Sequence, residues 1–172
     1  MDTEDTPGGT ATEETKPTTW CPSGRADAPE SVVLGVRSQS DASVTYLAAP
    51  TPAAELLPMI PANIEPTRVL RFASHCVSGC AHRSNNDCTL ISKIQMLPAA
   101  GEPAVPRCHL RARCQWWRQT GATACQRCPA VSTAYHADDS LSTRVADPAV
   151  TPAQLQRWID ADHDAAASDS RA

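Results

Sequence analysis

The segment CHLRARCQWWRQTGATACQRC, residues 108–128, contains four of the chain's eight cysteines. No other stretch of 21 residues in the chain contains as many cysteines. The last two form a Cys-x-x-Cys pair, a spacing that lets two thiolates and nearby backbone amides converge on one metal or cluster. We therefore predict a four-cysteine cofactor site formed by Cys108, Cys114, Cys125 and Cys128.

A second group of cysteines precedes this stretch. Cys76, Cys80 and Cys88 lie close together, and His82 follows Cys80 at a spacing at which a turn can direct both side chains toward one metal. We predict that these four residues are metal ligands, so that seven cysteines and one histidine supply two sets of four. Spacing alone does not decide whether the two groups bind separately or interleave. The remaining cysteine, Cys21, has no ligand residue near it and is interpreted as a bystander.

The composition explains why the fold needs such sites. The 172 residues include 15 prolines and only 4% aromatic residues, so the hydrophobic core is small and needs support from disulfides, metals or a partner. The N-terminus is acidic and lacks a secretory signal, and no stretch is apolar enough to span a membrane. We therefore expect a cytoplasmic protein with no membrane contact, in which the thiols stay reduced and bind metal rather than pair.

Two kinds of cofactor compete for these ligands. Structural zinc sites usually show two short knuckles, and this chain has a single Cys-x-x-Cys. Iron–sulfur clusters are also held by four cysteines. Cys128 is followed by Pro129, as the last ligand is in bacterial ferredoxins, and Trp116 and Trp117 can shield a cluster from water. We favour an iron–sulfur cluster of the 4Fe–4S type, with zinc as the alternative and a redox-active thiol protein without metal as a third reading.

The run from Cys114 to Thr133 has the pattern C-x-W-W-x-Q-x-G-x-x-A-C-x-x-C-P-x-V-x-T. In this run, and over residues 76–133 generally, the chain resembles small, largely uncharacterised bacterial cysteine-rich proteins. The resemblance implies a bound cluster or metal and does not name a reaction. A Rieske centre fits less well, because its second ligand pair is Cys-x-x-His and Cys128 occupies the place of that histidine.

Charge is distributed unevenly along the chain. The formal net charge is -4, and residues 1–20 contain five acids against one lysine. Residues 67–128 contain nine Lys or Arg and two acids, a local balance of +7. A basic region of this kind can balance thiolates around a metal or meet nucleic acid. We favour a protein partner, either redox or biosynthetic, over nucleic acid.

The remaining sequence predicts a small, metal-stabilised α+β domain over residues 30–165, with a cysteine-rich, partly helical region at 75–133. Residues 1–29 and 166–172 are predicted to be disordered tails, since they offer little apolar surface to bury. Residues 31–37 and 42–47 flank a turn-like segment and predict an N-terminal β-hairpin. Residues 69–72 predict a third strand that leads directly to the first cysteines.

Helices are predicted at three places. An apolar stripe predicts one over residues 90–97, which ends before Pro98, and a second is expected over residues 111–119, before Gly121. Thr151 and Gln154 match the start of a third, which has an apolar face. No phosphate loop, nucleophile elbow, zinc-protease motif or dinucleotide fingerprint occurs, so an enzyme is not favoured. The predicted function is cluster binding for electron transfer or redox sensing, with a structural zinc interaction module as the alternative.

Overall fold

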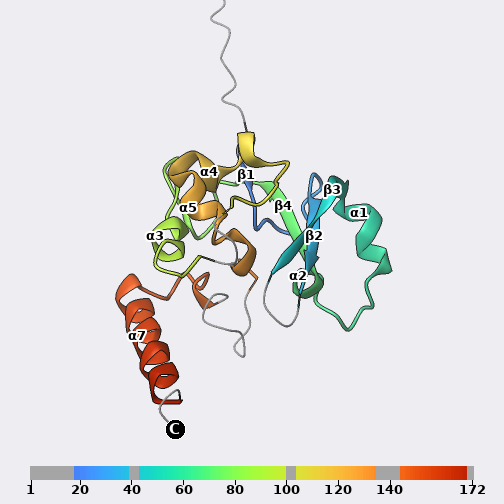
Figure 1. The fold of residues 1–172 in the computed structure, drawn as a ribbon. Helices are drawn as coiled ribbons and strands as arrows, with labels where there is room; N and C mark the ends of the chain where they lie inside the picture. The colour runs from blue at the N-terminus through green and yellow to red at the C-terminus, as the bar shows by residue number, and fades with distance from the viewer. Residues whose placement is uncertain (1–17, 39–42, 100–103, 135–143, 170–172) are drawn as a thin grey trace, which may run out of the picture.

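An antiparallel sheet of four strands lies at the centre of the fold. The computed structural model describes residues 18–38, 43–99, 104–134 and 144–169. The strand order is β1-β4-β2-β3, with β1 at Trp20–Cys21, β2 at Val32–Arg37, β3 at Val44–Pro52 and β4 at Leu70–His75. The helices of the cysteine-rich half lie beside β1, and α1 lies at the opposite edge (Figure 1). The predicted α+β class is confirmed, and the metal stabilisation of the domain stays a prediction.

Strands β2 and β3 form the predicted N-terminal hairpin. Gly35 pairs with Tyr46 and Arg37 with Val44, while the connecting residues 39–42 lie outside the described part of the chain. The predicted third strand is β4, which pairs with β2 so that Val33 faces Phe72. Valine and phenylalanine favour this extended pairing because their side chains pack well on a pleated surface.

Short helices connect β3 to β4, and a second, smaller hairpin and further short helices follow β4. After β3 come α1 (Ala53–Leu56), η1 (Leu57–Met59) and α2 (Pro66–Val69). After β4 come β5 (Arg83–Ser84), β6 (Asp87–Cys88), α3 (Leu90–Ile94), η2 (Arg111–Arg113), α4 (Gln115–Thr120), α5 (Ala122–Cys125) and η3 (Cys128–Ala130). The helices expected at 90–97 and 111–119 are present in shorter form, and Cys114 is extended between η2 and α4.

The main core lies in the cysteine-rich half. Trp116 is 1% exposed, and the apolar stripe predicted for α3 is buried around it, including Leu90 and Ile94. Cys114 and Cys128 are buried in the same cluster. These two cysteines are therefore part of the packing that holds the helical half together.

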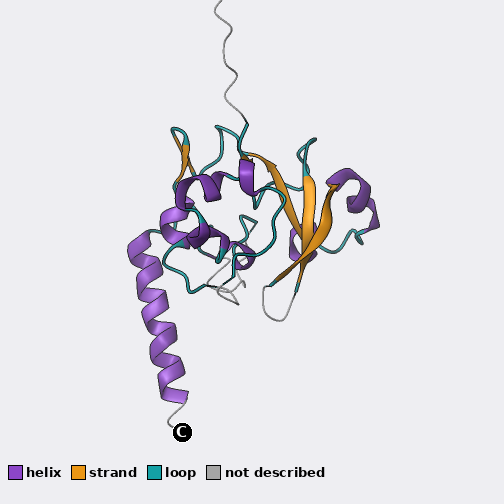
Figure 2. Cartoon of the chain, turned by 45° about the horizontal axis from the view of Figure 1, so that its top comes forward, coloured by secondary structure: helices purple, strands orange, loops and turns teal. Residues whose placement is uncertain are grey.

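Helix α7 (Pro152–Asp169) begins with the predicted cap. The Thr151 backbone N–H donates to Gln154 Oε1 at 2.8 Å, and the Gln154 N–H donates to Thr151 Oγ1 at 3.3 Å. Leu155 is buried in the main core, so the first turns dock as predicted. The later turns extend away from the body of the protein (Figure 2). Within the described ranges, no helix combines the length and apolar character needed to cross a membrane.

The N-terminal segment corrects the prediction of a disordered tail over residues 1–29. Trp20 pairs with His75 and Cys21 with Ser74, so this segment is an edge strand of the sheet. The Gly24 N–H then donates to the Phe72 carbonyl at 3.2 Å. Residues 1–17 lie outside the described residues. At the other end, α7 continues beyond residue 165 to Asp169, and residues 170–172 are not described.

Candidate metal centres

The structure brings the four cysteines of residues 108–128 to one cavity. Cys108, Cys114, Cys125 and Cys128, called here the first cysteine set, line it together with Tyr46, Arg111 and Trp116. The cavity is narrow, about 20 Å³. Its lining contains thiols, one phenol and one guanidinium and no carboxylate, which is a donor set suited to soft metals.

Local backbone geometry positions the first set. Cys108 precedes η2, Cys114 lies at the start of α4, and Cys125 and Cys128 flank the turn between α5 and η3. Gly121 joins α4 to α5 at φ 58°, a left-handed conformation that glycine adopts without strain. The turn at Gly121 directs Cys125 and Cys128 back toward Cys114, so that all three line the same cavity.

Hydrogen-bond donors surround the sulfurs of the first set. The Leu110 N–H donates to Cys108, and the N–H groups of Trp116 and Trp117 donate to Cys114. Arg111 donates to Cys125. Such donors stabilise the thiolate, which is the form that binds a metal.

Arg71 is the most unusual of these donors. Its side chain is 2% exposed, its Nη2 lies 3.1 Å from Cys128 Sγ, and its Nη1 donates to the Val131 carbonyl. Its Nε is buried and has no hydrogen-bond partner, and no carboxylate of the described residues forms an ion pair with it. A buried guanidinium is costly unless an anion compensates it. The thiol side of the cavity is where such an anion would form.

Burial has the opposite effect on the thiols themselves. It raises the pKa of Cys114 to about 12, even though the Trp117 N–H favours the thiolate. Burial likewise raises the pKa of Cys108 and of Cys125. These thiols therefore hold their protons at neutral pH until a metal or cluster displaces them, because coordination requires the deprotonated form.

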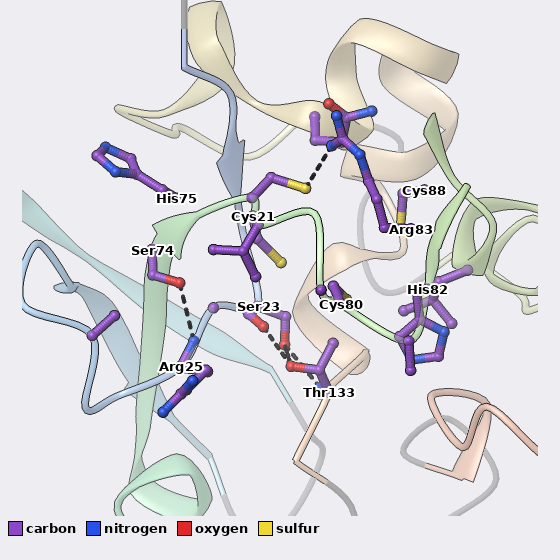
Figure 3. Close-up of a pocket in the computed structure, with 18 of the residues that line it drawn as sticks. Cys21, Ser23, Arg25, Ser74, His75, Cys80, His82, Arg83, Cys88 and Thr133 are labelled. Carbon is purple, nitrogen blue, oxygen red and sulfur yellow. Dashed lines mark hydrogen bonds between the residues drawn. The ribbon is translucent and has the colours of Figure 1, made fainter. Parts of the chain in front are cut away.

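A larger cavity, of about 580 Å³, contains the remaining cysteines. Cys21, Cys76, Cys80 and Cys88 line it and are called here the second cysteine set. Figure 3 shows Cys21, Cys80 and Cys88 around this cavity. The structure thus brings together the three predicted cysteines of this group and adds Cys21, which was interpreted as a bystander.

His82, the fourth predicted ligand of this group, also lines the larger cavity. Its ring donates to the Ala146 carbonyl, and burial, followed by the charge of Lys93, lowers the pKa of His82. The charged groups that act on it are Lys93 and Asp147, and no cysteine is among them. In Figure 3 its ring lies beyond Cys80 as seen from Cys21.

Two polar residues of the Cys114–Thr133 run, which sequence reasoning gave no role, hold the second set in place. Gln119 accepts the Cys88 N–H at 2.8 Å and donates to the Cys88 carbonyl at 3.3 Å. The Thr133 N–H donates to Ser23 Oγ at 2.9 Å, two residues after Cys21 in sequence. The one sequence signal for Cys21 is Pro22, since Cys128 is also followed by proline.

No three Cys, His, Asp or Glu residues of the described chain form a group that could hold a metal ion. The sulfurs instead surround the two cavities. These cavities are adjacent, because Trp116 lines both of them. Pro22 lines the narrow cavity, and Cys21, to which it is bonded, lines the larger one.

Comparison of the chain with protein-family models, curated proteins and solved structures finds no match. The resemblance to bacterial cysteine-rich proteins therefore stays a prediction.

Proposed function

We propose that this protein binds an iron–sulfur cluster through the first cysteine set and serves a partner protein in electron transfer or redox sensing. The observation that supports it best is the convergence of four thiols on one cavity beside the buried guanidinium of Arg71. With all four thiols protonated, no anion among the described residues compensates that guanidinium. With thiolates around a cluster, it has one.

Compensation of charge alone does not separate a cluster from zinc, because both require thiolates. The ligand spacing favours the cluster: the gaps are irregular, there is one Cys-x-x-Cys pair, and Pro129 follows the last ligand. The packing adds to this, since the indole of Trp116 is buried against the cavity. Removal of water and hydrogen bonds to sulfur are the means by which proteins set the potential of a cluster.

A bound cluster would supply reversible one-electron chemistry. The chain's own residues would hold the cluster and neutralise part of its charge. Their burial would also determine from which side a partner protein can approach it. Cys114 and Cys128 are buried, whereas Cys108 and Cys125 are partly exposed. A redox partner would therefore approach on the side of Cys108 and Cys125.

The test is the composition of protein purified without oxygen. We expect iron, acid-labile sulfide and broad visible absorption in the wild type, and a clear loss of all three in the double variant Cys125→Ser/Cys128→Ser. The matched control is Thr123→Ala, an exposed position of the same helix, which should keep them. A colourless protein with stoichiometric zinc would replace this proposal with the structural zinc module.

A further inference from the structure

We infer that Cys21, Cys76, Cys80 and Cys88 form a second four-cysteine site, so that the chain holds two iron–sulfur clusters side by side. The four-cysteine set is argued from the fold alone. That iron and sulfide occupy it, rather than another thiophilic metal, rests on the proposed function.

Strand pairing brings Cys21 and Cys76 together, and the loop and small hairpin after β4 add Cys80 and Cys88. β1 and β4 are antiparallel neighbours, and the Cys76 N–H donates to the Thr19 carbonyl at 2.9 Å, so Cys21 and Cys76 lie at the same end of the sheet. Cys80 lies in the loop after β4, and Cys88 ends β6. All four thus line one cavity although the chain separates Cys21 from the others by more than fifty residues.

The surroundings of these sulfurs resemble those of the first set. Arg83 Nη1 donates to Cys76 Sγ at 2.9 Å. The Ser23 N–H donates to Cys21, and the Leu90 N–H and the Trp116 indole donate to Cys88. Each set thus has a guanidinium and backbone N–H groups directed at sulfur, the arrangement that stabilises thiolates around a cofactor.

The two acids that line this cavity are already engaged elsewhere. Asp27 accepts two hydrogen bonds from Arg25, at 2.9 and 2.6 Å, and Glu30 accepts the His75 N–H at 2.8 Å. The thiols are therefore the available soft ligands of the cavity. This favours iron–sulfur or another thiophilic metal over a hard cation such as calcium.

Cys21, rather than His82, completes the set. The Cys21 thiol lies within electrostatic range of the thiols of Cys76 and Cys88, and Cys88 in turn is within range of Cys76 and Cys80. His82 instead faces Lys93 and Asp147 and donates to a backbone carbonyl. His82 lines the same cavity, but its ring is already engaged by the Ala146 carbonyl, so the four cysteines are the better ligand set.

The two sites are separated by one layer of side chains. Trp116 lines both cavities, and its indole N–H donates to Cys88 of the second set. Cys21 of the second set is bonded to Pro22, which lines the first cavity. Arg71 lies within electrostatic range of Cys21 and donates to Cys128. Two clusters placed here would influence each other electrostatically and magnetically.

The experiment counts iron and sulfide per chain in anaerobically purified protein. Two 4Fe–4S clusters give about eight of each, and one gives about four. We expect about eight in the wild type, about four in Cys21→Ser and in Cys80→Ser, and about eight in the matched control His82→Gln, whose amide can still donate to Ala146. Electron paramagnetic resonance of the reduced wild type should show coupling between two clusters that Cys21→Ser abolishes.

The possible results separate this inference from the proposed function. A wild-type count of about four irons would already overturn two clusters per chain, and this count needs no variant to fold. An unchanged count in Cys21→Ser would then show that the missing cluster is the one of the second set. Loss in His82→Gln with retention in Cys21→Ser would also overturn it. If Cys125→Ser/Cys128→Ser keeps its iron while Cys21→Ser loses it, the second site stands and the proposed function of the first set fails. Zinc or no metal throughout would overturn both cluster assignments.

Discussion

Arg71 Nη2 lies 3.1 Å from Cys128 Sγ inside the core, at a position where the guanidinium is almost completely removed from water. Tyr46 also donates a hydrogen bond to this sulfur. The relationship connects the sheet to the cysteine-rich half, because Arg71 belongs to β4 and Cys128 begins η3. It also places a fixed positive charge where a cluster would become more negative on reduction.

Replacing that charge should lower the reduction potential of the protein. In Arg71→Gln a polar side chain is kept and the charge removed, so the reduced state loses electrostatic stabilisation. We expect a fall of roughly 60 mV, which for one electron corresponds to about 1.4 kcal/mol. Anaerobic voltammetry measures it, with Arg157→Gln on the exposed face of α7 as the control. An unchanged potential in folded Arg71→Gln would show that this guanidinium does not act on the cluster.

Gly24 should be needed for the approach of the N-terminal segment to β4. A Cβ at this position would lie 2.2 Å from the Ser74 backbone nitrogen, so Gly24→Ala must displace one of the two segments. We expect a loss of about 1–3 kcal/mol in unfolding free energy, together with loss of metal from the second set. In Gly79→Ala the added methyl meets nothing within 4 Å, so this variant should match the wild type. Equal stability of the two variants in thermal unfolding would argue against the close approach.

His82 should make the protein sensitive to acid. Burial and Lys93 lower the pKa of His82, so the unfolded chain takes up a proton at a higher pH than the folded protein does. The stability that depends on neutral His82 is present above about pH 6.5, the unfolded value, and is lost as the pH falls through the folded pKa. Urea unfolding at about pH 7 and about pH 5 should therefore show a smaller loss in His82→Gln than in the wild type. Equal losses would mean that His82 is not the group that titrates.

Local sequence patterns predicted the elements that depend on near neighbours. The hairpin of β2 and β3 follows from two apolar segments around a turn, α3 from its apolar stripe, and α7 from the reciprocal cap of Thr151 and Gln154. The grouping of the first cysteine set could also be predicted from the sequence, because its four members lie within one short stretch.

The second set was predicted only in part, for a physical reason. Cys21 joins it through the pairing of Trp20 with His75, a contact between residues far apart in sequence, which no local pattern records. The polar residues around Cys21 bury little apolar surface of their own and so indicated a tail. His82 is close to Cys80 in sequence and lines the same cavity, but its ring donates to the carbonyl of Ala146, on a distant part of the chain, and no local pattern records that contact.

The measurement that tests the central claim most directly is anaerobic voltammetry of the wild-type protein, combined with thermal unfolding before and after chelation. If cysteine-held clusters transfer electrons, a reversible couple should be found between roughly −700 and +450 mV, without loss of folded structure during cycling. The contrary result is the absence of any couple in a zinc-loaded protein that unfolds when the zinc is removed, as a purely structural metal module would.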